Sequence, residues 1–174
     1  FQLYLQHDRG FTQALVQRAE AAGYEALVLT VDAPTSGIRD RERRAAFRLP
    51  PGIGPVNLAG LQPAPAPQLQ PGQSALFDGL LHQAPTWDDI AWLRSITRLP
   101  VLLKGVLHPA DATQAVAAGA AGVIVSNHGG RTLDTAPPTA VALPRVAQAV
   151  AGAVPVLVDG GIRRGTDVLK AMAL

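Results

Sequence analysis

Residues 122–134 read GVIVSNHGGRTLD, an apolar run that ends abruptly in a polar, glycine-rich cluster. The first four residues form a continuous apolar run of strand length, which is typical of a strand buried on both faces of a parallel sheet. A plain turn after such a strand needs only glycine or asparagine. It does not need His128 and Arg131 in one short loop. The stretch therefore predicts a buried strand with a functional site at its carboxyl end.

The same unit, a short apolar run followed by a helical pattern, recurs along the chain. Further strand-length runs lie at residues 26–31 (ALVLTV), 101–104 (VLLK) and 156–159 (VLVD), and residues 1–4 are predicted to end an earlier strand. Helical apolar periodicity covers residues 12–22, 87–98, 109–118, 139–150 and 164–174. This alternation predicts parallel strands joined by right-handed helical crossovers. Two α/β folds fit it, a (β/α)8 TIM barrel and an open doubly wound sheet.

One long segment, residues 49–85, breaks the rhythm. It is rich in proline and glutamine, with PAPAPQLQPGQ at its centre. A stretch of this length without elements of its own is usually a lid or a disordered loop. Because it follows the strand that carries Thr30 and Asp32, we expect it to border the site and to be the least ordered part of the chain.

The composition is that of a globular domain, or of a piece of a larger one. Of the 174 residues, 48% are hydrophobic and 16% charged, so a sizeable core can form. The absence of cysteine excludes disulfides, zinc–thiolate sites and cysteine nucleophiles. No apolar run approaches the roughly 20 residues that cross a bilayer, and no signal-peptide pattern is present. We therefore expect a cytoplasmic protein without a transmembrane segment.

The charge pattern argues against a nucleic-acid partner. The formal net charge is only +2, and the five arginines between residues 39 and 48 alternate with Asp40 and Glu42. Alternating signs indicate a solvated face and not a basic tract for nucleic acid. Arg41, Arg43 and Arg44 are assigned to that face.

Polar side chains gather where the predicted strands end. These residues are Gln2, Tyr4, Thr30, Asp32, Lys104, Ser126, His128 and Asp159. Several are pairs spaced i, i+2, which a strand places on one face. In a barrel that face can be the interior at the carboxyl rim, where active sites lie. Strands that merely become polar on leaving the core would explain one or two such ends, but not five. The pattern therefore favours a site.

A second glycine-rich turn follows the last predicted strand, in DGGIRRGTD at residues 159–167. Gly160 and Gly161 would let the backbone approach a ligand closely, and the helix that follows offers N–H groups and a positive dipole end to an anion. Arg163 or Arg164 can add a charge-assisted fork to phosphate oxygens. On a late strand of a barrel, this turn predicts a phosphate site.

Together these motifs identify a family resemblance. FQLY, LTVDAPTSGIRDRERR, LPVLLKGVLHPADA, GVIVSNHGGRTLD and VLVDGGIRRGTDVLKAMAL cover nearly the whole chain outside residues 49–85. They resemble the FMN-dependent α-hydroxy-acid oxidases and dehydrogenases, a family that includes glycolate oxidase, lactate oxidase, and lactate and mandelate dehydrogenases. The resemblance implies FMN as cofactor, oxidation of an (S)-2-hydroxy acid to the 2-oxo acid, and a homo-oligomer, a tetramer in this family.

The resemblance also implies roles in handling the substrate. His128 would be the base that takes the hydroxyl proton, and Asp32 would pair with the imidazole and stabilise its cationic form. Arg131 and Arg39 would hold the substrate carboxylate, because a planar guanidinium binds a carboxylate bidentately. The Tyr4 hydroxyl would assist at the substrate.

The remaining roles implied by the resemblance concern the cofactor. Lys104 would lie near the N1–O2 edge of the flavin and stabilise the anionic reduced ring. The residues expected to hydrogen-bond the ring are Gln2, Thr30 and Ser126. Those expected at the ribityl phosphate end are Asp159, Gly160, Gly161 and Arg163.

Counted from FQLY, the chain corresponds to strands three to seven of the family's eight-stranded barrel. Residues 1–174 are thus expected to form a partial FMN-binding barrel with a lid loop at 49–85. Alone they would expose two unpaired sheet edges, so we expect them to bind FMN weakly or not at all and to self-associate.

Two other functions remain open from the sequence. One is another FMN barrel enzyme such as an isomerase, against which the base and carboxylate clamp in SNHGGR argue. The other is a non-catalytic remnant that no longer binds flavin. His7, His82 and His108 lack metal-ligand spacing and are expected at the surface, so no metal site is predicted.

Overall fold

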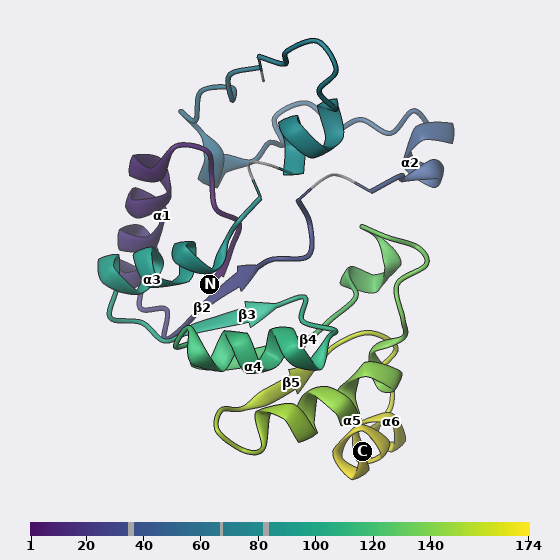
Figure 1. Cartoon of the computed structure of the whole chain (residues 1–174). Coiled ribbons are helices and arrows are strands. Elements are labelled where there is room, and N and C mark those ends of the chain that lie inside the picture. Colours follow the sequence, from purple (N-terminus) through teal and green to yellow (C-terminus); the bar gives the residue numbers. More distant parts are fainter. Residues whose placement is uncertain (35–36, 67, 82–83) are drawn as a thin grey trace.

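The computed structural model describes residues 1–34, 37–66, 68–81 and 84–174 (Figure 1). Its strands are β1 (Gln2–Leu3), β2 (Leu27–Thr30), β3 (Val101–Lys104), β4 (Gly122–Val125) and β5 (Val156–Val158). Its α-helices are α1 (Arg9–Ala21), α2 (Asp40–Arg44), α3 (Trp87–Ile96), α4 (Pro109–Ala117), α5 (Thr139–Val150) and α6 (Gly165–Ala173). Every apolar run predicted as a strand contains one, and the first residues of the chain form β1.

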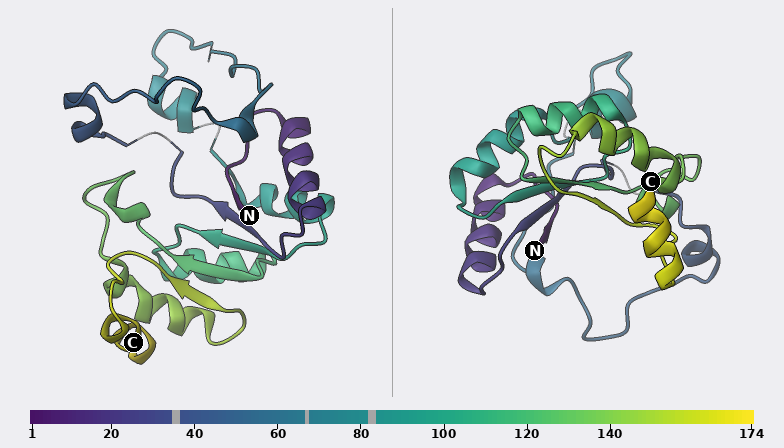
Figure 2. Two further views of the ribbon diagram at one scale, coloured as in Figure 1. Left: turned by 180° about the vertical axis from the view of Figure 1, so that it is seen from behind. Right: turned by 90° about the horizontal axis from the view of Figure 1, so that it is seen from below.

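The sheet order distinguishes between the two folds that the sequence left open. The strands follow each other as β1-β2-β3-β4-β5, and every neighbouring pair is parallel. A doubly wound sheet reverses its strand order at a switch point and carries helices on both faces. Here the order never reverses, and the helices form an outer arc around the strands (Figure 2). The arrangement is that of a partial (β/α)8 barrel, which confirms the predicted fold class.

The hydrophobic core lies between the strands and this arc of helices. Alternate strand residues point outward into it, and those that are almost fully buried are Leu3, Leu27, Leu29, Val101, Leu103, Val123 and Val125. They meet the apolar stripes of the helices, for example Leu15 and Val16 of α1 and Val146 of α5. Burial of this stripe, more than helix propensity, holds each helix in place.

The inner faces of the strands are less covered. Val28, Leu102 and Ile124 are only half-buried, and Leu157 of β5 is 42% exposed. In a closed barrel these positions fill the interior with packed side chains. Their exposure here follows from the five-stranded sheet, whose concave side lacks opposing strands within the described residues.

Helix boundaries shift where side chains cap the backbone. Helix α1 begins at Arg9, ahead of the predicted residue 12, because the Asp8 carboxylate accepts the Phe11 amide at 3.0 Å. Helix α3 ends before Thr97. The hydroxyl of Thr97 and the backbone amide of Arg98 both donate hydrogen bonds to the carboxylate of Glu20. The Thr97 hydrogen bond, helped by the one from Arg98, lowers the pKa of Glu20.

Among its described residues, the segment predicted to lack elements contains short helical turns, a 3₁₀ turn at Val56–Leu58 and a π-helical one at Ala75–Leu80. Its 3₁₀ turn lies beside α1, where Arg18 Nη2 donates to Asn57 Oδ1 at 3.2 Å, and the rest of the segment runs across the molecule toward α2 (Figure 1). Just before it, α2 forms where no helix was predicted. Its acidic residues occupy the first turn and its arginines the last, which complements the helix dipole.

Candidate active site

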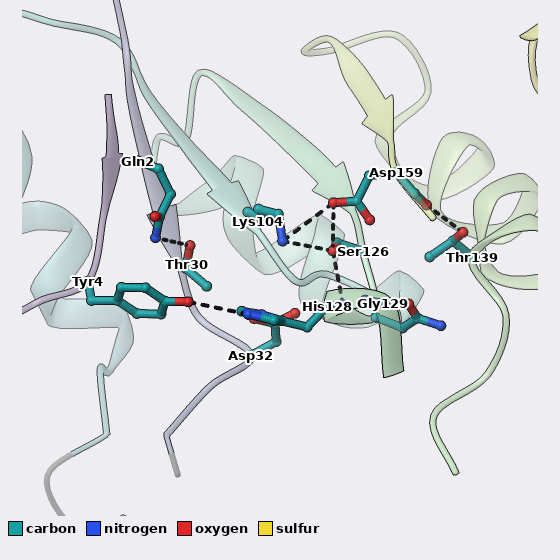
Figure 3. Close-up of polar contacts among 11 residues, drawn as sticks. Gln2, Tyr4, Thr30, Asp32, Lys104, Ser126, His128, Gly129, Thr139 and Asp159 are labelled. Atoms are coloured by element: carbon teal, nitrogen blue, oxygen red, sulfur yellow. Dashed lines mark hydrogen bonds and ion pairs between the residues drawn. The ribbon is translucent and has the colours of Figure 1, made fainter. Parts of the chain in front are cut away.

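The carboxyl ends of the five strands bring the predicted polar residues together (Figure 3). Tyr4, Asp32, Lys104, Ser126, His128 and Asp159 all lie in or just after strands β1 to β5. Because the strands are parallel and adjacent, their carboxyl ends share one edge of the sheet. The alternation of side chains then turns these residues toward the concave side.

His128 sits at the centre of a hydrogen-bonded chain. Its Nδ1 lies 2.8 Å from Asp32 Oδ1, and its Nε2 lies 3.3 Å from the Tyr4 hydroxyl. The side chains of His128 and Asp32 are only 20% and 11% exposed. A carboxylate on Nδ1 keeps the proton there and leaves the Nε2 lone pair on the Tyr4 side. The imidazole is therefore arranged to accept a proton at Nε2, with its orientation fixed by Asp32.

The side chain of Asp32 packs against the backbone of Gly105, at a position where only glycine fits. Gly105, directly after β3, has a φ of 109°, and a Cβ built there would lie 2.4 Å from the Asp32 Cβ. Asp32 Oδ2 is buried and has no hydrogen-bond partner among the described residues. His128 is thus the hydrogen-bonding partner of this carboxylate in the described structure. The sequence analysis missed Gly105, although a glycine after a polar strand end was the available signal.

A cavity of about 300 Å³ opens beside the Tyr4–His128 contact, and Arg39 and Arg131 also line it. The two arginines come from loops after different strands. The two loops pack tightly against each other at Gly37, since a Cβ at this position would lie only 1.8 Å from the Arg131 carbonyl oxygen. The close approach at Gly37 therefore places two guanidinium groups at one cavity together with the histidine.

A single carboxylate bridges the two arginines. Arg131 Nη2 donates to Glu42 Oε1 at 3.0 Å, and Arg39 Nη1 lies 3.5 Å from Glu42 Oε2. The Arg131 hydrogen bond, supported by the charge of Arg39, lowers the pKa of Glu42 against the opposing effect of desolvation. Sequence reasoning placed Glu42 on a solvated face. Its place between the two arginines depends on the fold of the loops.

A second polar cluster lies on the neighbouring strands. Lys104 Nζ donates to Ser126 Oγ at 2.9 Å and lies 3.4 Å from Asp159 Oδ2, while the Ser126 hydroxyl donates to Asp159 Oδ2 at 3.0 Å. Gln2 Nε2 separately donates to Thr30 Oγ1 at 2.9 Å. The predicted cofactor-binding residues thus form two hydrogen-bonded groups on the concave side (Figure 3).

The glycine-rich turn after β5 leads into α6. Gly160 and Gly161 have φ values of 88° and 78°, in the left-handed region that glycine adopts without strain. The amides of Arg163 and Arg164 are already occupied, since both donate to Asp167 Oδ2, at 3.1 and 3.0 Å. An anion at this turn would therefore have to use the glycine backbone and the arginine side chains.

The turn and the end of β5 fit the ribityl phosphate part of a flavin nucleotide, with its hydroxyls and its phosphate, on two further observations. Asp159 Oδ1 is buried without a hydrogen-bond partner among the described residues, so it can accept a bond from a ligand hydroxyl. A cavity of about 470 Å³ adjoins the turn, and Thr139, Gly160, Gly161 and Lys170 help to line it. Sequence reasoning did not single out Thr139, whose hydroxyl donates to the Asp159 carbonyl at 2.6 Å, or Lys170.

The described residues contain no cluster of histidine, aspartate or glutamate that could hold a metal ion. His7 and His108 are exposed, as predicted, and His108 Nδ1 accepts the Ala110 amide at the start of α4. His82 lies outside the described residues. Among the helices that the structure describes, none has the length and apolar character to cross a membrane.

Known proteins are similar to this chain along its whole length. Residues 1–174 match the model of the family described as FMN-dependent dehydrogenase. An L-lactate oxidase of Roseobacter sp. (strain GAI101) is 56% identical over 174 residues, which are 100% of this chain and 47% of that protein. Glycolate oxidase 3 of Arabidopsis thaliana is 49% identical over 175 residues, with 100% and 48% covered.

Solved structures agree with the sequence relatives. A mandelate oxidase variant with (S)-mandelic acid superposes with a TM-score of 0.82 at 44% identity, over 99% of this chain and 45% of that one. The chain thus spans about half the length of the curated relatives it matches. The family match, the partial barrel and the identities of about 50% agree, and the chain belongs to the FMN-dependent dehydrogenase family.

Proposed function

We propose that the protein containing this chain oxidises an (S)-2-hydroxy acid to the 2-oxo acid with FMN as first electron acceptor. The observation that carries the proposal is the Tyr4–His128–Asp32 chain, which faces a cavity that two arginines also line. A base beside paired guanidinium groups suits a small substrate with both a hydroxyl and a carboxylate. Relatives named L-lactate oxidase, glycolate oxidase and mandelate oxidase support this substrate class.

Each residue of the cavity has a distinct part in this proposal. Arg39 and Arg131 bind the substrate carboxylate and so fix the position of the hydroxyl on the adjacent carbon. His128 Nε2 takes the hydroxyl proton, and the Tyr4 hydroxyl hydrogen-bonds the substrate oxygen beside it. As the imidazole becomes positive, the carboxylate of Asp32, 2.8 Å from Nδ1, stabilises the charge.

FMN would lie on the concave side of the strands. Gln2 and Thr30 would hydrogen-bond its ring, and Lys104 would place a positive charge near the edge that becomes anionic. The ribityl phosphate end would meet Asp159, Gly160, Gly161 and Arg163. When bound, FMN supplies the group that accepts the electron pair from the substrate Cα.

Three further features remain proposals. Residues 49–85 would act as a lid, although none of their described residues lines the cavity beside His128. The tetramer implied by the family resemblance and the cytoplasmic location expected from the sequence would apply to the complete protein. Light scattering of the purified complete protein tests the tetramer, and fractionation of the source cells tests the cytoplasmic location.

The reaction is tested by mixing the complete, purified protein anaerobically with lactate, glycolate or mandelate. We expect protein-bound flavin to lose its absorbance with at least one of (S)-lactate, glycolate and (S)-mandelate, and to keep it with the corresponding amide, which lacks the carboxylate. A protein that carries flavin but reacts equally with acid and amide would contradict the arginine clamp. A protein that binds no FMN would support the non-catalytic alternative.

A further inference from the structure

Three consecutive residues in the loop after β4 have a left-handed backbone. The φ values of His128, Gly129 and Gly130 are 56°, 63° and 69°. Glycine adopts this region without strain, but a residue with a Cβ does so at a cost, and L-residues seldom adopt it in succession. Backbone hydrogen bonds from Gly130 to Asn127 and from Arg131 to His128 span the turn. The conformation of His128 still costs free energy, so the surrounding structure must stabilise it.

The side chain of Asn127 forms hydrogen bonds at both ends of this loop. Its Oδ1 accepts the Gly129 amide at 3.1 Å, inside the left-handed turn. Its Nδ2 donates to the Pro137 carbonyl at 3.2 Å, close to the start of α5. The first is the bond of an Asx turn, in which an asparagine side chain binds the backbone two residues further on. One amide group thus supports the turn and also closes the loop.

The carbonyl that Asn127 reaches belongs to a stiff and anchored part of the loop. Pro138 follows Pro137, and a residue before proline is restricted to extended conformations, while each proline ring fixes its own φ. The next residue, Thr139, is buried, and its hydroxyl donates to the Asp159 carbonyl at 2.6 Å, just after β5. Asn127 therefore ties the left-handed turn to a segment that the neighbouring strand holds in place.

The loop that Asn127 closes carries two groups of the proposed site. His128 and Arg131 both belong to it, and both line the same cavity. His128 lies within the left-handed turn, so the direction of its imidazole depends on the bond to Gly129. Arg131 lies beyond the turn, in the span that the bond to Pro137 closes. The two hydrogen bonds of Asn127 therefore act mainly on different groups.

We propose that Asn127 is a positioning residue for both proton transfer and substrate binding. Its Oδ1 holds the left-handed turn that presents His128, and its Nδ2 closes the loop that places Arg131. The roles of His128 and Arg131 rest on the proposed function, but that function gives no part to Asn127. Because each bond acts on a different group, the two effects can be separated by substitution.

Two substitutions in the complete, FMN-loaded protein separate the two hydrogen bonds. Asn127→Ala removes both of them. Asn127→Ser keeps a neutral side chain whose hydroxyl can still accept the Gly129 amide, although more weakly, but is too short to reach the Pro137 carbonyl. Anaerobic stopped-flow mixing with an (S)-2-hydroxy acid gives the saturating rate of flavin reduction, which reports on His128. The acid concentration that half-saturates this rate reports on Arg131.

The two variants should differ in the rate but not in the binding of the acid. We expect Asn127→Ala to lower the saturating rate and to raise the half-saturating concentration, each by about fivefold or more, the equivalent of one ordinary hydrogen bond. Asn127→Ser should recover most of the rate, to within about twofold of the wild type, while its half-saturating concentration stays as high as in Asn127→Ala. A general loss of stability would not produce this split.

Hydrogen exchange of the same proteins follows the loop without any substrate. Peptides that cover residues 128–137 should exchange faster in Asn127→Ala than in the wild type, while exchange in β4 stays unchanged. His108→Ala is the matched control, because His108 Nδ1 also accepts an amide two residues further on, that of Ala110 at 3.2 Å, at an exposed position before α4. This control should leave the rate, the half-saturating concentration and the exchange of residues 128–137 unchanged. Should Asn127→Ala fail to fold, Asn127→Ser still tests the proposal by its raised half-saturating concentration at a near-normal rate.

Two results would overturn this role of Asn127. One is an Asn127→Ala variant with the rate and the half-saturating concentration of the wild type. The other is a rate that falls equally in Asn127→Ala and Asn127→Ser. Failure of the proposed function would look different, since no 2-hydroxy acid would then reduce the wild-type flavin. In that case, faster exchange confined to residues 128–137 in Asn127→Ala would still support the positioning role, and unchanged exchange would overturn it.

Discussion

Replacement of Asp32 by asparagine isolates the charge that pairs with His128. The amide has nearly the size of the carboxylate, so the close packing against Gly105 is kept. Its oxygen can still accept from the imidazole, but it carries no negative charge. The variant therefore removes the electrostatic stabilisation of a protonated His128, at the cost of placing an amide NH2 where the buried Oδ2 has no partner.

The size of the effect follows from the geometry of the pair. His128 Nδ1 and Asp32 Oδ1 are 2.8 Å apart, and both side chains are largely buried. With charge centres ~4 Å apart and an effective dielectric constant of ~20, the attraction is about 4 kcal/mol. A barrier change of about 1.4 kcal/mol is a tenfold change in rate. The full attraction would correspond to about 10³-fold, and because the imidazole is only partly charged in the transition state, we expect Asp32→Asn to slow flavin reduction by ~10–10²-fold.

Anaerobic stopped-flow measurement of flavin absorbance in the complete protein gives this rate directly. The concentration of acid that half-saturates the rate should change little, since Arg39 and Arg131 are untouched, and the FMN content should stay normal. Asp111→Asn provides a matched control, because Asp111 is an exposed carboxylate in the first turn of the outer helix α4. That variant should react at the wild-type rate.

Flavin reduction in Asp32→Asn within a few-fold of the wild-type rate would contradict this role of Asp32. The charge of Asp32 would then contribute nothing to proton transfer at His128. A variant that lost FMN altogether would show instead that Asp32 holds the carboxyl rim of the sheet together.

Three further changes test other parts of the structure in the complete protein or in the isolated chain. Arg131→Lys keeps the charge but loses the planar fork, so KM for the acid should rise by tenfold or more, and an unchanged KM would contradict the clamp. Glu42→Gln releases both arginines from an exposed bridge that solvent screens, so KM should rise by no more than about fivefold at constant kcat, and a fall in KM would count against the bridge. The pKa of Glu42 is lowered, so the carboxylate and its bridge to the arginines should be intact at pH values above the usual carboxyl pKa. The bridge should be lost as the pH falls through the lowered pKa of Glu42, and the KM of the wild type measured across acidic pH checks this. Residues 1–174 prepared alone should self-associate through the free edges at β1 and β5 and the exposed Leu157, whereas a monomeric, flavin-loaded, active preparation would contradict that expectation.

The strands and most helices could be predicted because their signals are local. Four apolar runs mark β2 to β5, and periodic stripes mark α1 and α3 to α6, so only the capped ends shifted. Helix α2 was missed because five charged residues carry no apolar period. The strand order, which distinguishes a barrel from a doubly wound sheet, is a property of long-range pairing that no single segment encodes.

The candidate site was predictable in its members but not in its connections. Polar residues at strand ends were visible in the sequence, and the pairing of His128 with Asp32 was expected from the family resemblance. The positions of Gly105 and Gly37 became meaningful only once two loops were seen to approach there. The hydrogen bonds of Ser126 likewise join three strands that are far apart in the chain. Sequence patterns name such residues without showing which of them touch.

The role of His128 as the base for a 2-hydroxy acid can be checked by single-turnover kinetics. The complete protein and its His128→Gln variant, each loaded with FMN, are mixed anaerobically with the best (S)-2-hydroxy acid, and the single-turnover rate of flavin reduction is recorded. Loss of a general base costs about 10²–10⁴-fold, and loss of the pair with Asp32 adds to it. We predict that the variant retains FMN and is reduced at least 10²-fold more slowly, whereas reduction at a rate near that of the wild type would contradict the account.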